Sequence, residues 1–203
     1  MSARDLIDAR AELLEGLDAG IHCPCCGQWA KRYRRKLNQL QARWLMWLVG
    51  IAGEEDRRWV EIHDAAMVAS RRAFGLADGP TGGEYAKLAY WQLIEQVSND
   101  DDSKRTSATW RPTILGRDFA RRRLRVPSHV YIFDGRIEGW ATDLISIDDA
   151  LGVEFDYAEI MAAAGMPPDD WISSGCDACH VPGWLPWAPP PPEVDDDGQL
   201  ALC

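Results

Sequence analysis

The sequence predicts an α+β fold that is mainly helical, and three stretches in the middle of the chain carry this prediction. Thr81-Gly82-Gly83-Glu84 matches a capping box and opens a helix over Tyr85–Gln96. A polar loop, Asn99–Arg105, follows it, and a second helix is predicted over Ile114–Arg123. A helix, a hairpin with a charged tip and a returning helix together predict a winged helix-turn-helix core. We expect a zinc knuckle before this core and an extension after it.

Length and composition fit a globular chain without a membrane partner. The 203 residues are 46% hydrophobic and include ten Trp, enough for one ordinary domain with extensions or two small domains. No apolar run approaches the roughly 20 residues that span a bilayer, and Met1–Gly20 lacks a secretory pattern, so we expect a cytoplasmic protein. Four regions are predicted: 1–30, N-terminal helix and metal knuckle; 31–125, winged-helix core; 126–164, β-hairpin and short helices; 165–203, a Pro/Trp/Asp-rich extension with an acidic tail.

The net charge of −10 conceals a strong asymmetry along the chain. Residues 31–130 carry nineteen basic and twelve acidic side chains, whereas residues 131–203 carry one basic and fifteen acidic. A basic middle attracts phosphate, and an acidic C-terminal third repels or mimics it. The charge pattern therefore admits either a nucleic acid or a protein as partner.

Two Cys-x-x-Cys pairs indicate metal binding. Cys23-Pro24-Cys25-Cys26-Gly27 reads as a zinc knuckle, in which two thiolates grip one ion from a tight turn. A second pair supplies the rest of a tetrahedral site, and the predicted Zn²⁺ ligands are Cys23, Cys26, Cys176 and Cys179. Such a site is structural and holds the two ends of the chain together. Alternatively, one pair is ordinary reduced thiols; Cys25 is the spare thiol, and the substitute ligands are His22, His63 and His180.

The N-terminal third is predicted to be two helices around the knuckle. Asp5–Leu17 has apolar residues at helical spacing and is a plausible dimer element or a cap on the core. A second helix is predicted from Lys31 to about Ile51, with an apolar stripe through Trp44 and Trp47. Its first turns hold the predicted phosphate contacts Lys31, Arg32, Arg34 and Arg35, for which a solvated face is the alternative.

Within the core, Trp59–His63 reads as a short strand, and Asp64 is placed to cap a helix over Ala65–Phe74. The helix over Tyr85–Gln96 would be the recognition helix, exposing Thr81, Gly82, Lys87, Tyr90 and Trp91. Lys87 is its only cation, which weakens a sequence-specific DNA reading.

The predicted wing and the helix after it end in the densest positive cluster of the chain. Ile94–Ser98 and Ser107–Pro112 are predicted to pair as the wing. The cluster that follows would lie along a nucleic-acid backbone, or else is a solvated helix end. Its members are Arg117, Arg121, Arg122, Arg123 and Arg125.

The remainder of the chain carries clear local signals. Asp134-Gly135 predicts a hairpin between Val126–Phe133 and Arg136–Trp140. Short helices are predicted after Ser146 and over Asp156–Ala163. In the extension, the residues expected to dock on the body or on a partner are Trp171, Trp184 and Trp187.

Three motifs resemble a group of poorly characterised proteins encoded by bacteriophages and prophages. The first motif is the knuckle followed by Tyr33–Asn38, and the second is Gly82–Glu95. The third is Ser146–Gly152 followed by Phe155-Asp156-Tyr157. The resemblance covers about Ile21 to Met161. It implies a winged-helix body with an N-terminal metal knuckle, and action inside an infected bacterial cell. It carries over no catalytic residues, and the second Cys-x-x-Cys departs from the group.

Two functions follow from these observations. The first is a DNA-binding winged-helix protein, regulatory in role, that contacts the duplex through its basic clusters. The second is a non-enzymatic phage protein that binds and inhibits a host protein of the transcription or defence machinery. We expect no enzyme, because the sequence offers no nucleophile–base pair, phosphate-cradling glycine loop or open metal site.

Overall fold

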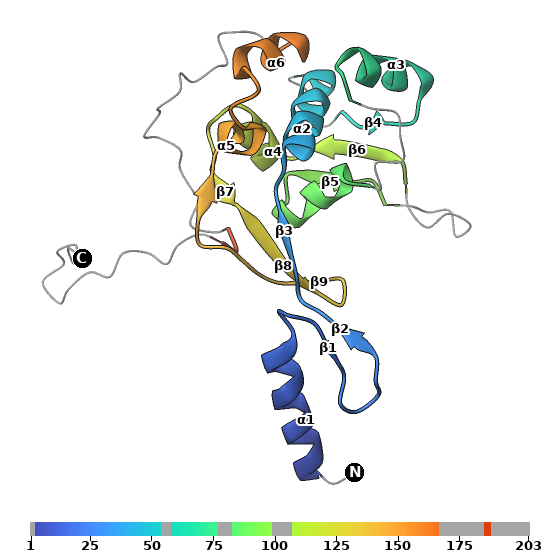
Figure 1. Cartoon of the computed structure of the whole chain (residues 1–203). Helices are drawn as coiled ribbons and strands as arrows, with labels where there is room; N and C mark the ends of the chain where they lie inside the picture. Colours follow the sequence, from blue (N-terminus) through green and yellow to red (C-terminus); the bar gives the residue numbers. More distant parts are fainter. Residues whose placement is uncertain (1–2, 54–57, 77–82, 99–106, 167–184, 188–203) are drawn as a thin grey trace, which may run out of the picture.

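The structure is a computed structural model that describes residues 3–53, 58–76, 83–98, 107–166 and 185–187 (Figure 1). It is a mixed α+β fold, as predicted. The helices, among which η1 is a 3₁₀-helix, are α1 Ala3–Gly16, α2 Gln39–Ala52, α3 Ala65–Ala73, η1 Tyr85–Trp91, α4 Ile114–Ala120, α5 Ile147–Leu151 and α6 Tyr157–Ala163. The strands are β1 Ile21–His22, β2 Trp29–Ala30, β3 Tyr33–Lys36, β4 Val60–Glu61, β5 Ile94–Gln96, β6 Thr109–Pro112, β7 Val126–Pro127, β8 His129–Phe133, β9 Arg136–Trp140 and β10 Leu144–Ile145.

Helix α2 lies at the centre of the core. It contacts η1, β6, α4, α5 and α6, which surround it on most sides. Its buried residues are Gln41, Ala42, Trp44, Leu45, Met46, Trp47, Leu48, Val49 and Ala52. A helix that is apolar on nearly every face must be covered on nearly every face, so α2 fixes the positions of its neighbours.

The predicted single helix from Lys31 to Ile51 is wrong in its first part. Asn38 caps α2: its side chain accepts a hydrogen bond from the Gln41 amide, and the Gln41 side chain accepts one from the Asn38 amide. This capping box starts the helix at Gln39. The four residues Tyr33–Lys36 instead form strand β3, which pairs with β8.

Strands β4, β6 and β5 form a three-stranded antiparallel sheet beside α2. The pairing of β5 with β6 confirms the hairpin predicted for Ile94–Ser98 and Ser107–Pro112, and the loop between them lies outside the described residues. Asp64 caps α3 as predicted, since its side chain accepts hydrogen bonds from the amides of Ala66 and Met67.

The predicted recognition helix is shorter and tighter than the sequence indicated. η1 ends at Trp91 because Gln92 adopts a left-handed conformation with φ of 56°, and β5 begins two residues later. Glu84 makes no side-chain cap; its carboxylate pairs with Lys87. Trp91 was expected to be exposed but is fully buried, and its Nε1 donates a 2.7 Å hydrogen bond to the Pro127 carbonyl. Thr81 and Gly82 lie outside the described residues.

Helix α4 also ends earlier than predicted. The Thr113 side chain caps it by accepting a hydrogen bond from the Gly116 amide. The chain leaves the helix after Ala120, and Arg122 takes the left-handed region with φ of 62°. The arginines that were assigned to the end of one helix therefore lie on a helix, its cap and a following turn.

The second three-stranded sheet has the order β3-β8-β9. The Asp134-Gly135 hairpin joins β8 to β9 as predicted, and both turn residues have positive φ, 48° and 72°, as a two-residue type I′ turn requires. The predicted region boundary at residue 125 does not separate two structural units, because β3 lies before it and β8 after it. The helices predicted after Ser146 and Asp156 are present and capped by those residues.

The N-terminal helix predicted at Asp5–Leu17 is α1, and it extends from the end of the molecule remote from α3 and α6 (Figure 1). Of the three tryptophans expected to dock the extension, Trp187 is buried and its ring lies 5.6 Å from that of Trp140 on β9. Trp171 and Trp184 lie outside the described residues. Among the helices that the structure describes, none has the length and apolar character needed to cross a membrane.

Gly116 provides a test of the packing between α4 and the chain before β5. A Cβ at this position would overlap the Leu93 carbonyl, which is backbone and cannot move aside. We expect Gly116→Ala to lower the free energy of unfolding by about 1–3 kcal/mol or more, measured by urea denaturation. Gly139→Ala is the matched control, because a Cβ there meets nothing within 4 Å. Equal stability of the two variants would contradict the packing described.

Candidate functional site

The structure does not gather the ten predicted nucleic-acid contacts on one surface. Arg117 and Arg121 are buried, with 5% and 7% of their surface exposed. The Arg117 guanidinium donates to the Gly53 carbonyl at the end of α2. These two arginines are part of the protein interior, and the prediction that they belong to an exposed positive patch is wrong.

Arg122 and Lys87 are engaged by acidic side chains. The Arg122 Nε donates a 2.8 Å hydrogen bond to Asp148, and its guanidinium lies 3.7 Å from the centre of the Tyr157 ring. Lys87 pairs with Glu84, the N-cap residue of η1. An ion pair must be broken before either cation can neutralise a phosphate, so neither is a favourable contact.

Arg123 and Arg125 are exposed in the turn that follows α4. Arg123 lies close enough to Asp118 to lower the pKa of that carboxyl, although burial has the larger effect and raises it overall. These two are the exposed members of the predicted arginine cluster, whereas Arg122 is half-buried.

Two of the remaining predicted contacts, Arg34 and Arg35, lie on β3, which we call the basic strand, Tyr33-Arg34-Arg35-Lys36. All four side chains are exposed, and the half-buried Lys31 and Arg32 precede them. The strand lies at the edge of its sheet, with Arg34 opposite Tyr131 and Lys36 opposite His129 on β8. Because side chains alternate along a strand, Arg32, Arg34 and Lys36 share one face, while Tyr33 and Arg35 share the other.

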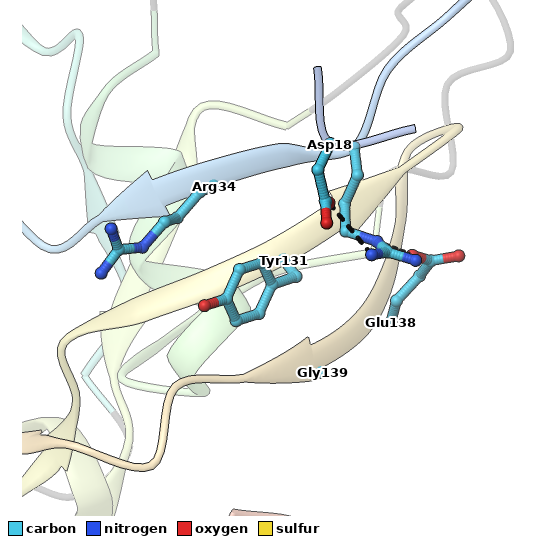
Figure 2. Close-up of a pocket in the computed structure, with 6 residues that line it drawn as sticks. Asp18, Arg34, Tyr131, Glu138 and Gly139 are labelled. Carbon is cyan, nitrogen blue, oxygen red and sulfur yellow. Dashed lines mark hydrogen bonds and ion pairs between the residues drawn. The ribbon is translucent and has the colours of Figure 1, made fainter. Parts of the chain in front are cut away.

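A cavity of about 580 Å³ opens on the first of these faces, and we call it the strand cavity (Figure 2). It is lined by Asp18, Arg32, Arg34, Tyr131, Glu138 and Gly139. Arg32 is held between two carboxylates, at 3.0 Å from Asp18 and 2.7 Å from Glu138. The hydrogen bond to Glu138 is the main reason that the pKa of Arg32 is raised. One end of the cavity is therefore an ion-pair group of one cation and two carboxylates, in which one negative charge is left over.

Arg34 lies at the other end of the cavity, within a polar network. Its guanidinium is 3.2 Å from His129 Nδ1, and Ser128 Oγ is 2.7 Å from the same nitrogen. The pKa of His129 is lowered, first by burial and then by the charge of Arg34. A hydrogen bond from Ser128 lowers the pKa of Asp143, to which His129 and Arg34 also contribute. Arg34 thus faces a neutral imidazole and, within the described residues, forms no ion pair.

The predicted zinc knuckle is a short hairpin between β1 and β2. The Cys23 amide donates to Gln28 and the Gly27 amide donates to Cys23, which closes the turn. The amides of Cys26 and Cys25 also point at the Cys23 sulfur and lower the pKa of its thiol. By contrast, burial and the neighbouring Cys23 raise the pKa of Cys25. A thiolate stabilised by two backbone amides suits Cys23 to metal binding, and Cys25 is the less suited thiol.

The second half of the predicted metal site, Cys176 and Cys179, lies outside the described residues. Within the described part of the chain, no three His, Cys, Asp or Glu side chains are grouped to hold a metal ion. The four-ligand Zn²⁺ site thus stays a prediction.

Comparison with known proteins gives no match to a protein-family model, to a curated protein or to a solved structure. The site is therefore defined by its own geometry. Sequence reasoning did not single out Tyr131 and His129. The Asp134-Gly135 turn fixes which strand residues share a face, but nothing local indicated that β3, almost one hundred residues earlier, pairs with β8.

The network at Arg34 predicts a pH response. Because the folded-state pKa of His129 is lowered, protonation favours the unfolded chain. Stability is therefore highest above the ordinary histidine value of about 6.5 and falls as the pH drops through the folded-state pKa. Histidine NMR titration should give His129 a midpoint below that value. Arg34→Gln should raise the midpoint only partly, since burial is the larger cause, and an unchanged midpoint would contradict the contact.

Proposed function

We propose that this chain is a DNA-binding protein that contacts backbone phosphates through the basic strand. The observation that supports this proposal is the exposure of Arg34, Arg35 and Lys36, none of which pairs with a carboxylate among the described residues. Exposed cations that pair with no carboxylate can neutralise phosphates directly, whereas cations that are buried or already paired cannot do so without losing their present contacts. The buried and paired arginines of α4 and its turn then serve the fold.

We infer further that the segment from α2 to β6 is a winged helix-turn-helix. The chain order α2, β4, α3, η1, β5, β6 and the sheet order β4-β6-β5 support this inference. In that fold η1 would be the recognition helix, yet its cation is paired with Glu84. Binding through the basic strand therefore suits a protein that reads DNA weakly by sequence. A regulatory role inside a phage-infected bacterial cell is the setting that the family resemblance implies.

A host protein is the second candidate partner, and α1 favours it. Leu6, Ile7 and Leu14 are 49%, 68% and 51% exposed on a helix that extends away from the core (Figure 1). Exposed large apolar side chains on one helix are typical of an interaction surface, including one between two copies of the chain. This function needs no phosphate contact, so the absence of DNA binding at low salt would favour it over the first.

The salt dependence of DNA binding tests the proposed function. Affinity for a duplex of random sequence should fall steeply between about 50 and 200 mM salt, because each neutralised phosphate releases a counterion. Arg35→Ala with Lys36→Ala should weaken binding and reduce the slope of log K against log salt by about 2. Fluorescence anisotropy of a labelled duplex measures both quantities.

The matched control removes two exposed cations elsewhere, Arg10→Ala with Arg58→Ala, which changes the net charge equally. The control should leave the slope unchanged. Equal effects of the two double variants would mean that overall charge, not the basic strand, governs binding.

We also propose that Cys23 and Cys26 bind a structural Zn²⁺ together with Cys176 and Cys179. Purified protein should contain about one zinc per chain, and Cys23→Ser should release it and lower the melting temperature, because structural zinc contributes folding free energy. Cys25→Ser is the control and should retain the metal. Full zinc content in Cys176→Ser would exclude the two-ended site, and metal analysis with thermal denaturation reads out each case.

A further inference from the structure

Within the strand cavity, one face of the Tyr131 ring is left uncovered, because Gly139 beside it has no side chain. The two residues are direct partners in the pairing of β8 with β9. A Cβ built on Gly139 would meet nothing within 4 Å, so the space beside it is empty. Figure 2 shows the Tyr131 ring between Arg34 at one end and the Asp18–Glu138 group at the other. The cavity thus combines a flat apolar surface with a cation at one end.

We infer that the strand cavity binds one unpaired nucleotide of a single-stranded nucleic-acid segment, an inference that rests on the proposed function. The base stacks on Tyr131, and the phosphate on its strand pairs with Arg34. A cavity of about 580 Å³ is within the range of about 300–1,000 Å³ typical of small-ligand sites. The DNA partner is therefore a duplex that carries a single-stranded segment.

The charges around Arg34 favour a phosphate at that end. Lys36 lies on the same face of β3, and both cations face His129, which is neutral at pH 7 because its pKa is lowered. Asp143 is the acidic group that faces this network, and Ser128 hydrogen-bonds to it. Two cations against one carboxylate leave this end positive.

The opposite end of the cavity suits the edge of a base. Arg32 offsets one of the two negative charges of Asp18 and Glu138, which reduces their repulsion of a nucleic acid. Their remaining oxygen lone pairs accept hydrogen bonds from the amino group of a base, as carboxylates do with cytosine N4. Free phosphate would leave the aromatic surface unfilled.

The aromatic surface distinguishes an unpaired nucleotide from a paired one. A base within a duplex is stacked on both faces and cannot reach Tyr131, whereas a base in a single strand stacks on an aromatic side chain with little dependence on sequence. The basic strand at the mouth of the cavity would hold the backbone on either side. A duplex would make only the phosphate contacts of the basic strand. A single-stranded segment would make these contacts and also stack on Tyr131, so it would bind more tightly.

The test compares the full chain bound to a blunt duplex and to the same duplex with a single-stranded overhang, by fluorescence anisotropy at low salt. The overhang should tighten binding. Tyr131→Ala should remove this gain, a loss of about 5- to 140-fold for one stacked base, without changing affinity for the blunt duplex. Tyr131→Phe, which keeps the ring, should retain the gain.

Gly139→Val provides an independent variant, since its side chain would occupy the cavity beside Tyr131. It should also abolish the gain, and it decides the matter if Tyr131→Ala does not fold. If the overhang gives no gain, or if the gain survives both substitutions, the inference is overturned while binding to the blunt duplex still supports the proposed function. If neither DNA binds, both proposals are overturned.

Discussion

The burial of α2 is the constraint on which the other elements depend. Its apolar side chains point in nearly every direction, so the β4-β6-β5 sheet, η1 and three short helices must cover it. Gly50 and Gly116 show how close this packing is, because a Cβ on either would overlap a neighbouring carbonyl. The capping box at Asn38 fixes where the helix begins, and Leu37 is the last residue before it that reaches the core. The four residues before Leu37 must therefore leave the core, which is what places the basic strand at an exposed sheet edge.

Local signals in the sequence predicted the elements whose geometry is decided locally. The caps at Asp64, Ser146 and Asp156 and the turn at Asp134-Gly135 need only a few adjacent residues, and each is present. The failures concern partners that are distant in sequence. Tyr33–Lys36 fits a helix by its own composition, and its pairing with β8 decides otherwise. Trp91 was placed on an exposed face because nothing nearby shows that the Pro127 carbonyl accepts its Nε1 hydrogen.

The arginines show why charge alone is a poor guide to a binding site. Arg117 is buried because the last turn of α2 ends with carbonyls that need donors, and its guanidinium reaches one of them at Gly53. Arg122 pairs with Asp148, 26 residues later in the chain, and Arg32 pairs with Asp18, 14 residues earlier. No local sequence pattern indicates either pairing. Charged side chains on an edge strand also prevent pairing between molecules. That role accounts for cations at the strand edge, but it does not require the cavity beside Arg34 or the open face of Tyr131.

A chain with a net charge of −10 can bind a polyanion only where its local charge is opposite to the total. At physiological ionic strength, charges separated by more than about 8 Å are largely screened from one another. The acidic residues elsewhere therefore have little effect on a nucleic acid already bound at β3, and they act mainly by opposing its approach. The cations of β3 act within that distance, yet three of them supply limited affinity, and salt reduces it further. Stacking on Tyr131 is not screened in this way, since it depends on the contact of two rings rather than on net charge. In the proposed function the basic strand and the aromatic surface are therefore complementary: the strand would attract the backbone, and the cavity would bind a base that is unpaired in a single strand but stacked and paired in a duplex.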